Sequence, residues 1–387
     1  MIIKRVLFVL HILILSFSGS MAQSGEKEVY LLTCDPGSET YSIYGHSAIR
    51  IIDKTAAEDM VYNWGVFDFD TPNFNFKFAR GKLDYKLAVY SYKRFLKEYF
   101  TEERSVYLQK VNFDQRDIRK LDSLLKENLK KERLYYRYDF LKDNCATRIR
   151  DIFEDVLEDD MIYPAYEKDY NSSYRKRLKE YQSRIPWLDA GADLLIGSPG
   201  DDKCGFRESM FLPDYLMWNM SELKVNKGSG TYMLLEPPET VSEFSTPDSN
   251  NALYRQPWFV LLLGASIILL ITFKVKIVFV QNTIDLIFFS ALIVLSVLMV
   301  FVNFFSEHDA MNMNFNLIWL NPLLLLAPLF ILTKKKSRLF WLVHISLSMF
   351  YLVFIIFFKQ SINPAFIPLI AIIVVRSLYR LRLSEQL

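Results

Sequence analysis

Five apolar runs fill the last third of the chain and restrict its possible folds more than any other feature. Each run approaches or reaches the roughly 20 residues that an α-helix needs to cross a bilayer. We therefore predict an all-α transmembrane bundle of five spans over residues 257–387. The runs cover residues 257–273, 286–305, 315–332, 339–358 and 362–378.

The rest of the chain has a different character. Of all 387 residues, 51% are hydrophobic and 23% are charged, which is too apolar for one ordinary soluble domain and too charged for a membrane bundle alone. A composite protein satisfies both observations. The net charge is only +2, and no basic patch interleaved with aromatic residues occurs outside the predicted cytoplasmic loops, so we expect no nucleic-acid binding.

Residues 1–22 have the pattern of a secretory signal peptide. Lys4 and Arg5 precede an apolar run over 6–17, and the small residues at 20–22 predict cleavage before Gln23. Basic residues gather after the first, third and fifth spans, which places those ends in the cytoplasm by the positive-inside rule. Both observations predict a multi-pass protein of the inner membrane with its preceding domain in the periplasm. The basic residues are Lys274, Lys276, Lys334, Lys335, Lys336, Arg338, Arg380 and Arg382.

Residues 23–235 are expected to form this periplasmic domain. Residues 236–256 are rich in Pro, Ser and Thr, and we expect a linker there. Strand patterns alternate with helical ones, of which one helix is predicted to begin at Asp114, so the fold class is α+β. The strands are expected over 29–34, 46–52, 60–65 and 105–111.

Cys145 is the first candidate for a catalytic residue. It follows Asp143 and Asn144, either of which can cap a helix, and the apolar residues after it fall at helical spacing. The free N–H groups and positive dipole end of a helix N-terminus favour a thiolate over a thiol. The alternative is an inert cysteine buried in the core.

His46 makes the reactive interpretation more plausible. It follows Gly45 at the start of a predicted strand, and a histidine on a strand facing a cysteine on a helix N-terminus is the arrangement of an activated thiol. Asn63, on the next strand, would orient the imidazole, with Asp68 and Asp53 as rivals. We expect no metal and no cofactor, because the chain has only four histidines and lacks a plausible zinc cluster.

The other two cysteines, Cys34 and Cys204, leave two possibilities open. Export to an oxidising compartment permits a disulfide between them. The sequence gives no distance between the two residues, so a pair of isolated thiols is the alternative.

The order histidine, polar residue, cysteine resembles the circularly permuted branch of the papain-like NlpC/P60 superfamily, which includes lecithin:retinol-acyltransferase-like enzymes. Four features together resemble the lipoprotein N-acyltransferase family of Bacteroides-type bacteria. They are the Gly-His-Ser-Ala-x-Arg strand at 45–50, Tyr-Asn-Trp-Gly-x-Phe-Asp-Phe at 62–69, Asp-Asn-Cys-Ala-Thr-Arg at 143–148 and the five spans. The resemblance implies a permuted NlpC/P60 fold and an enzyme that moves an acyl chain from a phospholipid donor to the N-terminal amine of a diacylated lipoprotein. Cys145 would be the nucleophile, His46 the base and Asn63 the orienting residue.

Other residues are expected to contact the substrate. In the periplasmic domain these are Tyr44 and Asn144, which flank the two reactive residues. At the outer ends of the spans they are the polar residues His308, Asn314, Asn316 and Asn321, for which a merely interfacial position is the alternative. Alternating phenylalanines over 67–78 predict either an edge strand with one aromatic face or a surface that receives acyl chains or dips into the bilayer.

Two other classes of function remain open. A membrane-anchored cysteine peptidase or amidase of the cell wall would use the same Cys145 and His46, but it would gain little from five spans. A non-enzymatic envelope receptor would need neither residue.

Overall fold

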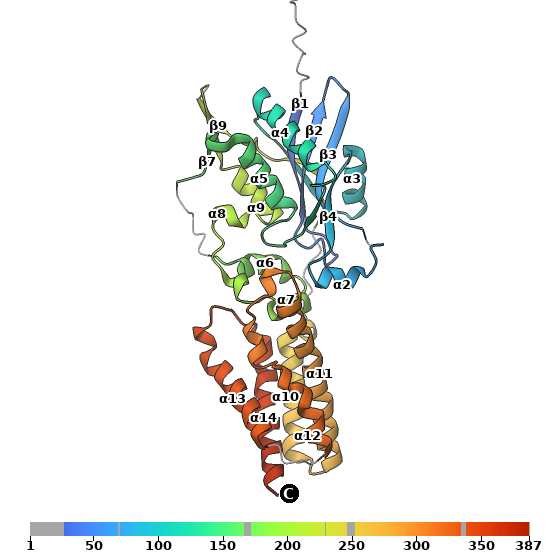
Figure 1. Ribbon diagram of the computed structural model, residues 1–387, viewed down its shortest axis with the longest axis vertical. Helices are drawn as coiled ribbons and strands as arrows, with labels where there is room; N and C mark the ends of the chain where they lie inside the picture. The colour runs from blue at the N-terminus through green and yellow to red at the C-terminus, as the bar shows by residue number, and fades with distance from the viewer. Residues whose placement is uncertain are drawn as a thin grey trace, which may run out of the picture.

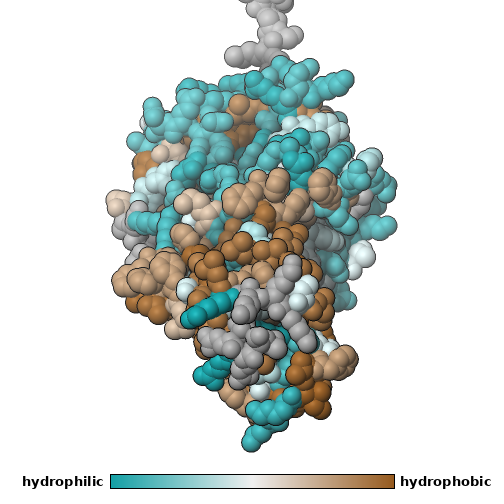
Figure 2. All heavy atoms as spheres, turned by 60° about the horizontal axis from the view of Figure 1, so that its bottom comes forward, coloured by the Kyte–Doolittle hydropathy of each residue, from teal (hydrophilic) through white to brown (hydrophobic). Residues whose placement is uncertain are grey.

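The computed structural model describes residues 27–68, 70–165, 172–228, 230–245, 252–333 and 338–386. The predicted signal peptide and the basic residues 334–336 lie outside these ranges. A sheet-containing domain stands above a bundle of long helices, with α6 and α7 between them (Figure 1). Hydrophilic side chains cover the upper domain, whereas hydrophobic ones gather over the bundle (Figure 2).

A seven-stranded antiparallel sheet forms the centre of the periplasmic domain, with the strand order β10-β5-β1-β2-β3-β4-β6. Neighbouring residues along its central strands pack into different apolar clusters, as expected for side chains that point to opposite faces: Leu31 and Ile49 lie in one cluster, and Leu32 and Ala48 in another. The strands are β1 (Lys27–Cys34), β2 (His46–Asp53), β3 (Glu58–Val66), β4 (Asp84–Ser91), β5 (Val106–Lys110), β6 (Tyr135–Arg137) and β10 (Glu239–Ser242).

Helices cover both faces of the sheet. Helix α3 (Tyr92–Thr101) buries Phe95 and Tyr99 against one face. Helices α4 (Gln115–Asn128) and α5 (Cys145–Leu157) bury their apolar stripes against the other. Asp114 caps α4 in a reciprocal capping box with Asp117, as the sequence predicted for that helix start.

Smaller elements complete the domain. A three-stranded sheet lies at the end away from the bundle; of four short helices, α6 and α7 lie next to the bundle, whereas α8 and α9 lie farther from it, near α5 (Figure 1). The strands are β7 (Met161–Ile162), β8 (Lys224–Lys227) and β9 (Gly230–Met233), and the helices are α6 (Tyr174–Gln182), α7 (Pro186–Leu195), α8 (Phe206–Ser209) and α9 (Pro213–Met220).

Two predicted segments differ in the structure. The predicted linker 236–256 contains β10, which pairs with β5 and so extends the sheet. The phenylalanine-rich segment does not form an edge strand: Asn73 adopts a left-handed conformation (φ 58°), and the short helix α2 (Phe74–Ala79) follows it. Phe69 lies outside the described residues.

The bundle contains five helical segments that are long and apolar enough to cross a membrane, within the ranges given above. The third is irregular, because proline lacks an N–H group and cannot continue a helix: two 3-10 turns precede α12 (Ala327–Thr333), and Pro322 opens the second of them. The other segments contain α10 (Pro257–Lys274), α11 (Val278–Phe305), α13 (Arg338–Phe354) and α14 (Ile367–Gln386).

A buried charged cluster joins three of these helices near their predicted cytoplasmic ends. Asp285 of α11 is fully buried and accepts hydrogen bonds from Arg376 and Arg380 of α14. Arg376 also donates to Thr272 of α10 and Gln281 of α11, each at 2.7 Å. Removing one partner of such a network is strongly destabilising, since it leaves a buried charge without compensation.

Candidate active site

The strand that begins at His46 is positioned by a glycine turn. Gly45 has φ +78°, and a Cβ at this position would lie 2.7 Å from the carbonyl oxygen of Cys34, the last residue of β1. Both constraints favour glycine. The turn brings His46 opposite Cys34 in the β1–β2 register. Both residues lie at the ends of central strands, and β2 contacts α5.

Cys145 is the first residue of α5, and Asn144 is its N-cap. The side-chain oxygen of Asn144 accepts from the N–H groups of Ala146 (2.8 Å) and Thr147 (3.0 Å), and its amide donates to the carbonyls of Phe140 and Phe211. The helix therefore begins as predicted, with Asn144 rather than Asp143 as the cap. These four bonds use the full hydrogen-bonding capacity of the Asn144 side chain. It therefore has no capacity left for the substrate contact that we expected from the sequence.

Asn63 lies in direct contact with His46. Its Oδ1 is 2.5 Å from Nε2 of His46, while its Nδ2 donates to the hydroxyl of Tyr90 on β4. With Oδ1 of Asn63 as the acceptor, Nε2 of His46 is the donor, which leaves Nδ1 as the ring nitrogen for the hydrogen bond with Cys145. The rivals are occupied elsewhere: Asp53 accepts from Thr55 and Ala56, and Asp68 accepts from the amide of Asp70.

The electrostatics favour an ion pair between Cys145 and His46. Burial alone would raise the pKa of Cys145, but the charge and hydrogen bond of His46, with backbone hydrogen bonds from Ser47 and Ala146, outweigh burial, and the pKa is lowered. Burial would lower the pKa of His46, but the charge and hydrogen bond of Cys145, followed by the bond to Asn63, raise it above its usual value. Both shifts stabilise thiolate with imidazolium.

The other cysteines contrast with Cys145. Both are free and buried, so they do not form the disulfide that the sequence permitted. The reason is their packing: Cys34 lies in the core under α3, and Cys204 in a separate cluster around Leu178 and Phe211. Burial raises the pKa of Cys34 well above its usual value and that of Cys204 to about 12.

Sequence reasoning missed three residues at this site. A Cβ on Gly65, which has φ +89°, would lie 3.8 Å from Cβ of Cys145, 3.9 Å from Cε1 of His46 and 3.9 Å from Cε2 of Tyr138. A Cβ there would be in ordinary van der Waals contact with all three side chains, so Gly65 lies where they converge. The hydroxyl of Tyr90 accepts the hydrogen bond from Nδ2 of Asn63. Gly65 belongs to the stretch 62–69 that the sequence analysis singled out, but nothing in the sequence marks Tyr90, because its role depends on the pairing of β3 with β4.

The site faces the membrane bundle. The loop before Cys145 is joined to the outer loop after α11 by an ion pair between Lys142 and Asp309, with N and O 3.2 Å apart. Nearby, the amide of Gly197 donates to the carbonyl of Ala310 at 2.8 Å. The helix that carries Cys145 therefore begins beside the outer surface of the bundle.

Two predicted substrate-binding residues serve as contacts within the protein. The hydroxyl of Tyr44 accepts from Gln182 at 2.6 Å, and its ring packs against Phe140. His308 contacts the carbonyl oxygen of Phe78 at 2.9 Å, so it attaches α2 to the bundle.

The predicted asparagines at the outer membrane face form a joint between the domains. The amides of Asn314 and Asn316 both donate to the carbonyl oxygen of Leu194, and Asn314 also donates to Leu195. These carbonyls end α7, where the helix itself leaves them without partners. Asn321 donates to Ile318, and its buried Oδ1 has no partner. The structure thus uses Asn314 and Asn316 for attachment, not for an open lipid site.

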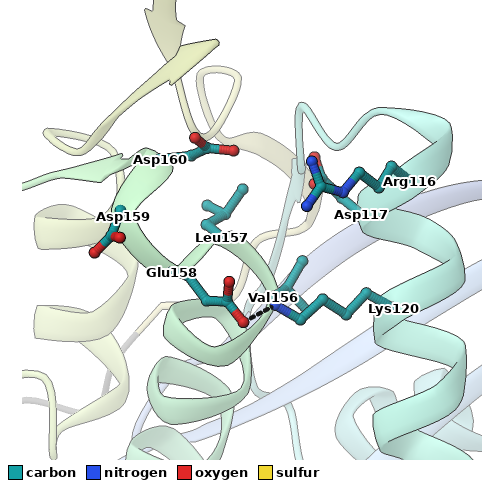
Figure 3. Close-up of a pocket in the computed structure, with 8 residues that line it drawn as sticks. All are labelled: Arg116, Asp117, Lys120, Val156, Leu157, Glu158, Asp159 and Asp160. Carbon is teal, nitrogen blue, oxygen red and sulfur yellow. Dashed lines mark hydrogen bonds and ion pairs between the residues drawn. The ribbon is translucent and has the colours of Figure 1, made fainter.

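A polar cavity of about 180 Å³ lies at the other end of α5. Figure 3 shows it between α4 and the residues that end α5, with an ion pair between Lys120 and Glu158 across it. Cys145 is at the opposite end of the same helix, so this cavity is separate from the candidate site.

Two family models match the chain on either side of residues 172–248. The model described as the Lnb N-terminal periplasmic domain matches residues 22–171, which include Cys145, His46 and Asn63. The model described as the Lnb transmembrane domain matches residues 249–386. The chain belongs to the Lnb family. No curated protein and no solved structure matches it.

Membership of the Lnb family confirms the coarse sequence predictions. The chain is an α+β periplasmic domain followed by a five-span transmembrane domain, and it is a multi-pass membrane protein connected with lipoproteins. The permuted NlpC/P60 relationship stays a prediction, as does the inner membrane as its location.

Replacing Gly45 with alanine should destabilise this Lnb-family protein by about 2 kcal/mol or more, because alanine at positive φ is strained and its Cβ would meet Cys34. Thermal unfolding in detergent measures the effect. Gly191→Ala is the matched control: Gly191 lies within α7 with open space around it, so alanine there should be neutral or slightly stabilising. Equal melting temperatures for the two variants would contradict the prediction.

The pKa shifts predict a pH profile for the thiol. Since the pKa of Cys145 is lowered, its alkylation by iodoacetamide should persist below the usual thiol range and fall only as pH drops through that lowered pKa. In His46→Gln the neutral side chain cannot stabilise the thiolate, so the midpoint should move up by about one pH unit or more. Peptide mapping assigns the label. An unchanged midpoint would show that His46 does not activate the thiol.

Proposed function

We propose that this Lnb-family protein transfers an acyl chain from a phospholipid, through a thioester on Cys145, to the N-terminal amine of a diacylated lipoprotein. The observation that carries the proposal is the contact of Cys145 with His46, which Asn63 orients, at a site that faces the membrane bundle. The family description supports the link to lipoproteins. Membrane substrates suit a nucleophile placed beside the bundle.

The first half-reaction forms the acyl-enzyme. The Cys145 thiolate attacks the carbonyl carbon of a phospholipid ester and gives a tetrahedral oxyanion. The amides of Ser47 and Ala146 both hydrogen-bond the sulfur, so they are the donors best placed for that oxyanion, and the Ala146 amide is shared with Asn144. The C–O bond then breaks, the His46 imidazolium protonates the leaving alkoxide, and a lysophospholipid departs.

The second half-reaction moves the acyl chain to nitrogen. The free α-amine of a diacylglyceryl cysteine attacks the thioester, and neutral His46 takes the proton that the amine loses. The C–S bond breaks and the Cys145 thiolate returns, paired again with imidazolium. The products are an N-acylated lipoprotein and the starting enzyme, so no metal, cofactor or redox partner is needed for balance.

The test is to trap the intermediate. Purified protein in phospholipid nanodiscs should gain the mass of one acyl chain on Cys145, hydroxylamine should remove it, and a diacylated lipopeptide with a free N-terminus should accept it. An adduct that water but not the lipopeptide removes would indicate a lipase. Cleaved peptidoglycan stem peptides without any acyl adduct would support the cell-wall peptidase. Normal function of Cys145→Ala in cells would support a receptor.

A further inference from the structure

An exposed aromatic patch spans the two domains at the outer end of α11. It consists of two rings from α2 and two from the last residues of α11, each more than half exposed. None of the residues of α2 is fully buried; its Phe74 packs against the core of the periplasmic domain, whereas Phe76 and Phe78 remain exposed. The patch residues are Phe76 (54% exposed), Phe78 (52%), Phe304 (68%) and Phe305 (58%).

Several contacts hold α2 against α11. The rings of Phe76 and Phe301 have centroids 5.9 Å apart, and His308 contacts both the ring and the carbonyl oxygen of Phe78. Arg80, directly after α2, donates to the carbonyl of Phe305. The ring of Phe305 also stacks on that of Phe301, with centroids 6.4 Å apart, so Phe76, Phe78 and Phe305 gather where a membrane-spanning helix ends. Aromatic side chains are favoured at this level of a bilayer.

A chain of touching rings connects the patch with the candidate site. From Phe78 each ring is in contact with the next. The last ring, that of Tyr138, lies within 4 Å of the position that a Cβ on Gly65 would take, and so does Cβ of Cys145. The centroid distances are 6.3 Å for Phe78–Phe74, 5.7 Å for Phe74–Phe67, 5.1 Å for Phe67–Tyr85 and 4.5 Å for Tyr85–Tyr138.

We propose that the aromatic patch binds an acyl chain of an outer-leaflet phospholipid and brings its ester along the row of rings to Cys145. This rests on the proposed function and adds the place where the donor leaves the bilayer. Three observations favour a phospholipid over another occupant: the exposed rings, their continuity with a membrane-spanning helix, and the apolar connection to the nucleophile. Ring faces and edges offer an acyl chain contact without a polar group to desolvate.

The central test introduces charge into the patch. The double variant Phe76→Asp, Phe78→Asp should acylate Cys145 from phospholipid in nanodiscs about tenfold more slowly or worse, because two buried apolar contacts with the lipid are lost. Its reaction with iodoacetamide and with soluble p-nitrophenyl acetate should match the wild type, since neither reagent needs the patch. Phe76→Leu, Phe78→Leu should restore most of the phospholipid rate.

The matched control places the same charges elsewhere. Ile162 and Met233 are 39% and 41% exposed on the small sheet, at the end of the domain away from the bundle (Figure 1). Ile162→Asp, Met233→Asp should leave phospholipid acylation unchanged. Equal rates for the two double variants would overturn the proposal, and so would an equal loss of reaction with p-nitrophenyl acetate in the patch variant, because the thiol itself would then be damaged.

A second measurement does not depend on catalysis. A phospholipid with a diazirine in its acyl chain should label residues 74–79 of the wild-type protein, and the patch variant should lose this label while its bundle stays labelled. Label confined to the bundle would overturn the proposal. Label at 74–79 from a diacylated lipopeptide but not from phospholipid would also overturn it, by assigning the patch to the acceptor. If the wild type forms no acyl-enzyme, the proposed function fails, and this labelling still decides whether the patch binds lipid.

Discussion

Cys145→Ser is expected to lower acyl transfer by about 10⁴-fold or more, as removal of the nucleophile does in enzymes that form a covalent intermediate. A serine hydroxyl has a far higher pKa than a thiol, so His46 cannot hold it in the ionised form that attacks the ester. Mass spectrometry of lipoprotein N-termini in cells that carry only the variant measures the loss directly.

The matched control for this substitution is Cys204→Ser. Cys204 is fully buried in a separate apolar cluster, and burial raises the pKa of its thiol to about 12. Its replacement should cost some stability and leave transfer intact. Retained N-acylation in Cys145→Ser, or equal loss in both variants, would contradict the assignment of Cys145 as the nucleophile.

Asn316→Leu is expected to destabilise the protein by about 2–6 kcal/mol and to loosen the joint between its domains. Oδ1 of Asn316 accepts from Nε1 of Trp319 and from the hydroxyl of Tyr351, and all three groups are buried. Leucine would remove this shared acceptor from both donors, at a cost of about 1–3 kcal/mol each. Thermal unfolding in detergent, together with proteolysis between residues 195 and 245, would measure the effect.

Asn321→Leu provides the comparison within the same segment. Asn321 is also buried, but it donates one bond, to Ile318 at 3.2 Å, and its Oδ1 has no partner. Leucine there removes one weak bond and one unsatisfied oxygen, so stability should change little. If Asn316→Leu were as stable as Asn321→Leu, the asparagines would not be the joint that their geometry indicates.

Local patterns in the sequence were sufficient for the spans and for the helix start and strand start that position Cys145 and His46. The five apolar runs predict their helices from composition alone. The cap before Cys145 and the glycine before His46 can both be recognised within a few residues, and Asn63 follows from the pairing of two adjacent strands. These features depend on short-range chemistry, which a single sequence displays.

Long-range contacts account for what the sequence did not predict. The partner of Asn314 and Asn316 is the backbone carbonyl of Leu194, about 120 residues earlier, and no side-chain pattern marks a carbonyl. The alternating phenylalanines suited a strand, but Asn73 turns the chain, and α2 is held by contacts with α11. Polar residues at a membrane face therefore suggested ligand binding where the fold uses them for attachment.

The cluster of Asp285, Arg376 and Arg380 ties assembly of the bundle to the end of translation. Asp285 leaves the ribosome 91 residues before Arg376. Until α14 is inserted, α11 carries a carboxylate at membrane depth without its two arginines, which is costly. We therefore expect newly made α11 to stay towards the cytoplasmic interface, where water solvates Asp285, until α14 supplies the two arginines. We also expect a chain truncated before residue 376 to be degraded faster than the full chain, because its α11 carries an unpaired carboxylate.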